Sequence, residues 1–386
     1  MTTPGPGVLA SERHVAEVAA QAMRDGGSAV DAVLAGFLAA AAFGPGVLLA
    51  PTGAIVAGPG AGVRVFDGRA VQAGHGAKRP RGLRPEDAVP MAARVAAPRT
   101  PAMLPLLHAY GATKTLAALG RLGRMRAKKE LKGEPSLAPR LRLLEAMAQR
   151  GPRALATSDV ARPLLQRAGP VAGGTLTEDD LRHARPGDEA GRFLPFAGDT
   201  ELAVTPWPPP PAAASRSDRG ANRDAPGWSY PRRAPRVVVA ADLSGLVAGL
   251  GYVPDPDGVA VPELGVTLAR DGEPVRRGVP RVTPGTPCAA NLPVGVMRRR
   301  RDGWHAAVGI TGARTLTGAS PPSSDANLNA WLEAWVAATD APDPSGRERV
   351  GDLPPRISGV EGLAVTSHRG RVRVVRVAPS TPCPSA

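Results

Sequence analysis

The stretch MRDGGSAVDAVLAGFLAA, residues Met23–Ala40, joins two helical patterns through a pair of glycines. The segment before it, Ser11–Arg24, has apolar residues on one face and therefore predicts a helix with Ser11 as its N-cap. Asp25-Gly26-Gly27 ends that helix, because glycine readily adopts the left-handed conformation of a C-cap.

A second helical pattern begins directly after the glycines. Ser28 is its predicted N-cap, and Asp31 lies three residues later, where a carboxylate completes a capping box. The pattern continues to about Ala42 and is apolar nearly all round. It therefore predicts a helix that is buried on every side.

Composition limits the classes of function. The 386 residues can bury a large core, which must be built from Ala, Val and Leu because only 3% of the residues are aromatic. The net charge of +14 comes almost entirely from arginine, and a basic chain can bind nucleic acid or anionic ligands. The arginines are scattered, however, with one run at Arg298–Arg301, and no helix-turn-helix pattern accompanies them. Nucleic-acid binding is therefore disfavoured, and an anionic small molecule stays open as a partner.

The sequence predicts a cytoplasmic protein that does not span a membrane. Its first residues lack the charged region and apolar region of a secretory signal. The apolar stretch Val33–Ala57 contains Gly44 and Pro51, which favour a buried helix and a loop over a transmembrane helix. Cys288 and Cys383 are too few for a disulfide framework or a metal site, so neither metal nor cofactor is predicted.

The rest of the chain shows helical patterns first and strand patterns later. The valines around Asp67-Gly68 predict a hairpin, residues 85–168 are mostly helical, and Thr177 with Asp180 predicts a second capping box. Residues 206–236 are rich in proline and charge and predict an exposed linker. The later segments predict strands around 236–253 and at 303–310, 362–370 and 371–379, and an amphipathic helix at Asn327–Thr339.

Six motifs occur in an order found in a known family. They are the opening stretch and the segments GPGAGVRVFDG, GGTLTEDDL, VTPWPPPP, VTPGTPCAANLP and WHAAVGITGA. This series resembles the gamma-glutamyltransferase (gamma-glutamyltranspeptidase, glutathione hydrolase) family, in which a helix ends in Gly-Gly-Asn-Ala-Val-Asp-Ala. Here Ser28 replaces the asparagine, and the resemblance covers roughly residues 7–315.

The resemblance implies an α+β fold, the N-terminal nucleophile hydrolase fold, which is a four-layer αββα sandwich of two stacked antiparallel sheets. Residues 1–205 would form a large-subunit-like region and residues 237–386 a small-subunit-like region of one combined fold. Residues 206–236 would replace the family's helical segment and cleavage site. Enzymes of the family cut themselves and expose a threonine, whose hydroxyl attacks the gamma-glutamyl carbonyl with its own α-amine as base.

The sequence departs from the family at the nucleophile. The family's threonine falls near Pro235, and no position within reach of a small shift in the match has a hydroxyl or a thiol: Arg232, Arg233, Ala234 and Arg236. Ser229, in the linker, is a candidate substitute. His305 is interpreted as a strand residue and Cys288 as an inert thiol.

The substrate-binding positions that the resemblance implies are altered as well. The paired serines that hold the substrate carboxylate fall on Ala289 and Ala290, and the asparagine pair falls near Ala269-Arg270. The family's arginine that binds the substrate carboxylate falls near His75, with Lys78 or Arg79 as possible replacements. Part of the element that stabilises the oxyanion is lost as well. The resulting candidate substrate-binding residues are His75, Lys78, Arg79, Gly309 and Gly312.

Three functions therefore stay open. The favoured one is a gamma-glutamyltransferase-like protein without self-cleavage or catalysis, which binds a glutamyl-type or other anionic molecule or a partner protein. The second is an active gamma-glutamyl hydrolase or transferase that uses an atypical nucleophile on glutathione-type substrates. The third is a basic protein that binds acidic surfaces or nucleic acid. The sequence indicates no oligomeric state.

Overall fold

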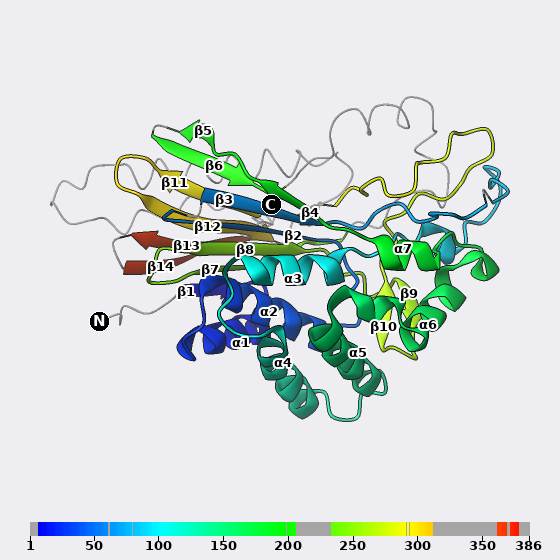
Figure 1. Ribbon diagram of the computed structural model, residues 1–386, viewed down its shortest axis with the longest axis horizontal. Coiled ribbons are helices and arrows are strands. Elements are labelled where there is room, and N and C mark those ends of the chain that lie inside the picture. The colour runs from blue at the N-terminus through cyan, green and yellow to red at the C-terminus, as the bar shows by residue number, and fades with distance from the viewer. Residues whose placement is uncertain are drawn as a thin grey trace, which may run out of the picture.

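Two stacked sheets and a layer of helices make up the part of the chain that can be described. The computed structural model describes residues 7–60, 62–78, 80–197, 199–205, 233–290, 292, 294–311, 361–368 and 371–377. Helices cover the outer face of the first sheet, and the second sheet packs on its inner face (Figure 1). These residues supply three layers of the expected αββα sandwich. The predicted helix at Asn327–Thr339 lies outside them.

The first sheet combines strands from distant parts of the chain. Its order is β1-β7-β8-β2-β3-β4, and every neighbouring pair is antiparallel. The strands are β1 (Gly7–Ala10), β2 (Thr52–Gly58), β3 (Gly62–Gly68), β4 (Gly187–Ala190), β7 (Arg236–Ala241) and β8 (Val247–Tyr252). Strand β7, the second in this order, therefore lies between the N-terminal strand β1 and the following strand β8.

The second sheet is also antiparallel, in the order β14-β13-β12-β11-β6-β5. Its strands are β5 (Leu194–Ala197), β6 (Thr200–Val204), β11 (Val294–Arg299), β12 (Trp304–Thr311), β13 (Glu361–His368) and β14 (Arg371–Val377). A separate pair consists of β9 (Val259–Val261) and β10 (Val266–Leu268). The predicted strands at 303–310, 362–370 and 371–379 correspond to β12, β13 and β14.

Strand β7 is apolar from Val237 to Ala241 because both of its faces are buried there. Val237 and Val239 point into the core between the two sheets, whereas Val238 and Ala240 belong to the core under the helices. A strand buried on both sides needs a continuous apolar run instead of alternation. The RVVVAA sequence therefore fits the middle of a sandwich.

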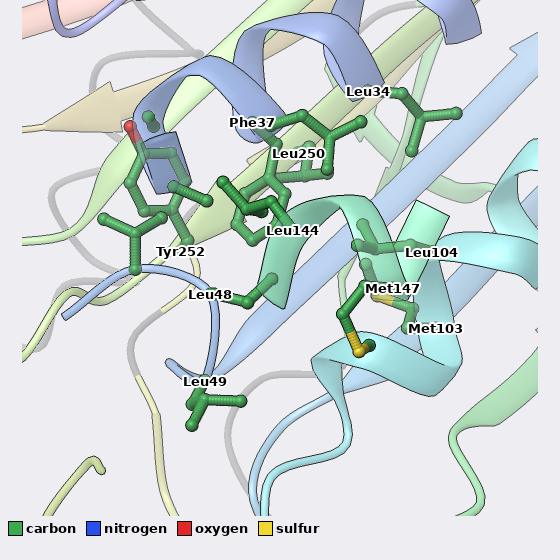
Figure 2. Close-up of a cluster of buried hydrophobic side chains, with 14 of the residues drawn as sticks. Leu34, Phe37, Leu48, Leu49, Met103, Leu104, Leu144, Met147, Leu250 and Tyr252 are labelled. Atoms are coloured by element: carbon green, nitrogen blue, oxygen red, sulfur yellow. The ribbon is translucent and has the colours of Figure 1, made fainter. Parts of the chain in front are cut away.

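Helix α2 (Ala29–Phe43) lies at the centre of the helical layer, with α1 (Arg13–Arg24), α4 (Leu116–Glu130) and the first sheet around it. Phe37 meets Tyr252 of β8 edge to face, with 5.5 Å between the ring centroids, and Figure 2 shows both within the apolar core. Gly123 lets α4 approach closely, since a Cβ there would lie 2.6 Å from the Cα of Ala39. The prediction of a helix buried on every side is confirmed.

The remaining helices complete that layer and one end of the molecule. They are α3 (Thr100–Gly111), α4 (Leu116–Glu130), α5 (Leu137–Arg150), α6 (Ser158–Ala168) and α7 (Glu178–His183), with short 3-10 turns at Met91–Arg94, Gly151–Ala156 and Pro170–Ala172. They confirm the helical pattern predicted for residues 85–168, although its first regular helix begins only at Thr100.

Both capping boxes are present, but two local predictions are wrong. Ser11 does not cap α1, which begins at Arg13, because its hydroxyl bonds the backbone of Val237 in β7 instead. The hairpin turn does not lie at Asp67-Gly68, which ends β3. Its turn joins β2 to β3 around Gly60, whose φ of 73° favours glycine.

Candidate functional site

The position that the resemblance assigns to the nucleophile lies directly before β7. Arg233 and Ala234 lead into the strand, and Pro235 is buried. The backbone N–H of Val237 donates to the Ser11 hydroxyl at 2.8 Å, which fixes the beginning of the strand against the N-terminal segment. No side chain from Arg233 to Arg236 carries a hydroxyl or a thiol.

Arg233 is held by two buried carboxylates. Its guanidinium pairs with Asp271 and lies 3.4 Å from Oδ2 of Asp255. Arg270 completes the group by donating to both carboxylate oxygens of Asp255, at 2.8 and 3.0 Å. Two arginines therefore balance two aspartates, and we call these four residues the Arg233 cluster.

The two aspartates of this cluster differ in their electrostatics. Burial opposes ionisation of Asp255, but the hydrogen bonds and charge of Arg270 and Arg233 outweigh it and lower the pKa of Asp255. For Asp271 burial dominates and raises the pKa to about 6, against the opposing effect of Arg233. Asp271 is therefore the member whose charge is most sensitive to pH near neutrality.

A platform of four segments lies beside this cluster. Val71 pairs with both Ala97 and Pro287, so three extended segments run side by side. The Ala96 N–H donates to the Ala269 carbonyl, and the Gly272 N–H donates to Arg94, which adds the segment that carries Asp271. The platform thus brings residues 70–72, 94–97, 269–273 and 286–288 together.

Asp67, Arg69 and Arg99 form a second buried group at the edge of this platform, the Arg69 cluster. Arg69 donates to the two carboxylate oxygens of Asp67 at 2.9 and 3.0 Å. Arg99 donates to the Asp67 carbonyl at 3.1 Å. The two arginines are only 5% and 6% exposed.

The Arg69 cluster has unused capacity for an anion. Nη1 of Arg69 and Nε of Arg99 are buried and have no hydrogen-bond partner within the described residues. Two guanidinium groups face a single carboxylate, which leaves an excess positive charge in a site of low dielectric. Buried donors without a partner are uncommon in proteins, and a carboxylate is a strong acceptor for arginine.

Cys288 connects the two clusters. Its backbone N–H donates to the Ala70 carbonyl at 2.8 Å, and the charges of Asp271, Arg69 and Arg99 all act on its thiol. Burial raises the pKa of the Cys288 thiol well above its usual value, so the thiol stays protonated at neutral pH. A protonated, buried thiol is a poor nucleophile.

The alanines that stand in for the substrate-binding serines follow Cys288. Ala289 is exposed, whereas Ala290 packs with Val253 and Leu292 in a small apolar cluster. Neither side chain can donate a hydrogen bond. The guanidinium groups of Arg69 and Arg99, by contrast, have buried donors that could bind a carboxylate.

His75 and Lys78 lie on the loop that follows the platform segment of residues 70–72. His75 Nδ1 lies 2.8 Å from Asp180 Oδ1, and the His75 backbone N–H also donates to that carboxylate. Asp180 in turn belongs to the capping box of α7 with Thr177. These contacts tie His75 to the start of α7, while the Lys78 side chain is exposed.

Gly309 lies in β12, where the two sheets approach each other. A Cβ at Gly309 would lie 3.1 Å from the side chain of Val237, the second residue of β7. The glycine therefore allows close packing beneath the start of that strand. The other candidate residues, Arg79, Ser229 and Gly312, lie outside the described residues.

Each arginine of the run at Arg298–Arg301 has an acidic partner. Glu201 pairs with both Arg298 and Arg300, and Asp302 pairs with Arg299 at 2.7 Å. Arg301 lies 3.6 Å from Asp199. The one strongly basic run of the sequence therefore does not present an uncompensated basic surface.

Neither a metal-ligand group nor a membrane-spanning helix occurs in the described ranges. Within them, no group of three or more His, Cys, Asp or Glu side chains is placed to hold a metal ion. In the same ranges, no helix combines the length and apolar character that crossing a membrane requires.

Comparisons with known proteins identify the fold. No protein-family model matches the sequence, and no curated protein matches it either. Among solved structures, LmbA2991 matches with a TM-score of 0.68 and 16% identity over 97% of this chain and 98% of that chain. A cephalosporin acylase from Bacillus halodurans matches with a TM-score of 0.60 and 12% identity over 97% of each chain.

The chain has the N-terminal nucleophile hydrolase fold. The α+β class and the sandwich expected from the resemblance are thereby confirmed, and at these identities the likeness concerns the fold alone. The gamma-glutamyltranspeptidase of Helicobacter pylori is also matched, at 17% identity and a TM-score of 0.44, over 58% of this chain and 79% of that chain.

Sequence reasoning did not find the buried arginines and aspartates of this site. Arg69 follows the end of β3 by one residue, but the resemblance directed attention to His75 instead. Arg99 and Asp271 have no motif around them. The one local signal was the Asp67-Gly68-Arg69 spacing, which lets the arginine fold back onto the aspartate.

Proposed function

We propose that this protein is a gamma-glutamyltransferase-like member of the N-terminal nucleophile hydrolase fold that neither cleaves itself nor catalyses acyl transfer. The observation that carries the proposal is the ion pairing of Arg233 with Asp255 and Asp271 directly before β7. This pairing places charged groups directly before strand β7, and none of these groups can act as the nucleophile.

Catalysis by this fold requires a hydroxyl or thiol on the first residue after the cut, with the new α-amine as its base. Pro235 supplies neither a nucleophile nor a primary amine. Arg233 lies upstream of the position where a cut would fall, so its ion pairs bind the uncut segment to the segment around Asp271. Both features favour a single intact chain.

The same protein is proposed to bind a small carboxylate at the Arg69 cluster. The support is the pair of buried, unpartnered donors on Arg69 and Arg99 and the excess positive charge beside Asp67. With alanine at positions 289 and 290, the guanidinium groups would provide the polar contacts. A molecule with a free carboxylate, such as a gamma-glutamyl compound, suits this chemistry.

Calorimetric titration of the full chain with L-glutamate and with glutathione tests the binding. We expect Arg99→Lys to weaken binding about tenfold, because lysine loses the forked donor geometry of arginine but keeps its charge. Arg64→Gln is the matched control, since Arg64 lies on the neighbouring strand β3 and pairs with Asp188 at the surface. Equal binding by Arg99→Lys and the parent protein would exclude this site.

A hydrolysis assay on the same samples tests the absence of catalysis. Turnover of a gamma-glutamyl anilide by the parent protein would contradict the proposal. If that turnover disappeared in Ser229→Ala, Ser229 would be the atypical nucleophile and the protein an enzyme. We expect no turnover in either protein above the uncatalysed rate.

A further inference from the structure

We propose that a basic groove between α4 and α5 is a docking site for an acidic segment of a partner protein. The groove has a volume of about 310 Å³ and is lined by Arg121, Arg124, Met125, Lys128 and Glu145. Figure 1 shows the two helices side by side at the edge of the molecule. The proposal does not depend on the proposed function.

The cations of the groove share one face of α4. Arg121, Arg124 and Lys128 lie at positions i, i+3 and i+7, so they form a row of roughly 10 Å along the helix. No ion pair involves any of them in the described part of the chain. The neighbouring Arg126, by contrast, is paired with Glu17 and Glu130.

In this respect the groove differs from the arginine run at Arg298–Arg301. Each arginine of that run has an acidic partner, whereas the three cations of the groove face a single carboxylate, Glu145. Nη1 of Arg124 is buried and lacks a hydrogen-bond partner. A ligand that brings carboxylates into the groove would satisfy this donor and reduce the repulsion between the cations.

The composition of the groove favours a peptide over other polyanions. Met125 is 58% exposed between the cations, which offers an apolar contact that a phosphate backbone does not use. Glu145 repels a continuous polyanion, but it can accept a hydrogen bond from a peptide N–H. The occupant is therefore an acidic segment that also carries an apolar side chain.

Fluorescence anisotropy with the full chain tests the proposal. The probes are a labelled Glu-rich peptide with a central leucine, the same peptide with alanine at that position, a single-stranded oligonucleotide, and anionic phosphatidylserine vesicles. Titrations at about 50 mM and about 150 mM salt separate specific docking from general attraction. We expect the leucine peptide to bind most tightly at the higher salt concentration.

Charge-matched variants locate the site. Arg121→Gln/Arg124→Gln/Lys128→Gln should weaken binding of the leucine peptide by about tenfold or more. Lys129→Gln/Arg150→Gln/Arg162→Gln removes three exposed cations that do not line the groove, and it should retain binding to within about twofold. Met125→Ala should weaken binding of the leucine peptide but not of the alanine peptide.

Three outcomes would overturn the proposal. Equal losses in the two triple variants would mean that general charge, not the groove, attracts the peptide. Tighter binding of the oligonucleotide or the vesicles would assign the groove to a different class of partner. Lack of any binding at both salt concentrations would mean that the groove is not a docking site.

Discussion

Arg233, which lies directly before strand β7, pairs with Asp271, a residue 38 positions later in the chain. The pair is buried, with side-chain exposures of 12% and 5%. It lies just upstream of the position near Pro235 that the resemblance assigns to the nucleophile. We therefore expect this pair to contribute to the stability of the protein.

Replacing Arg233 should destabilise the protein. Arg233→Met leaves Asp271 buried without its cation, which should lower the free energy of unfolding by about 2–4 kcal/mol. Arg277→Met is the control, because Arg277 is exposed. The double variant Arg233→Met/Asp271→Asn should recover part of the loss, since no buried charge is left unpaired there. Urea unfolding measures all three, and an unchanged single variant would mean that the pair contributes nothing to stability.

The raised pKa of Asp271 predicts a pH dependence of stability. The folded protein binds a proton on Asp271 up to about pH 6, whereas the unfolded chain releases it near its ordinary pKa of 3.8. The folded state thus holds more protons between these values, so the free energy of unfolding falls as the pH rises through this window.

Relative to Asp271→Asn, the parent protein should lose about 1–3 kcal/mol of stability between pH 4 and pH 6.5. Unfolding by urea at several pH values within this range measures the difference between the two proteins. A difference that grows in favour of the parent protein as the pH rises would show that Asp271 is stabilised in its charged form.

Asp31 is expected to be the critical polar residue of the opening stretch. It is fully buried and accepts hydrogen bonds from Ser28, Thr113 and the Lys114 backbone. Burial opposes its ionisation, but these bonds outweigh that effect and lower the pKa of Asp31. Asp31→Ala should lower the thermal midpoint strongly, with a loss of about 2–4 kcal/mol. The exposed Asp25→Ala is the control, and equal effects of both variants would refute this role.

The fold was predictable from the sequence wherever the signal is local. Ser28 with Asp31 and Thr177 with Asp180 cap helices because the partners lie three residues apart, so sequence spacing alone specifies the contact. Ser11 failed as a cap because its partner, Val237, lies 226 residues away. Local propensity carries no information about such a contact.

From the sequence, only the absence of a nucleophilic hydroxyl at the site was predictable. The missing hydroxyl near Pro235 is visible in the sequence, whereas the cation that occupies the site is not. Arg233 meets Asp255 and Asp271 only after the two sheets and the platform have assembled. The Arg69 cluster was missed for the same reason, since Arg99 reaches Asp67 from a different segment of the chain.

The intact mass of the purified protein after long incubation at neutral pH shows whether the chain cleaves itself. The account predicts one species at 39.6 kDa, unchanged over time, in the parent protein and in Ser229→Ala. Two fragments whose masses add up to the full chain, with a new N-terminus between residues 206 and 236, would contradict it. The first residue of the second fragment would then identify the nucleophile.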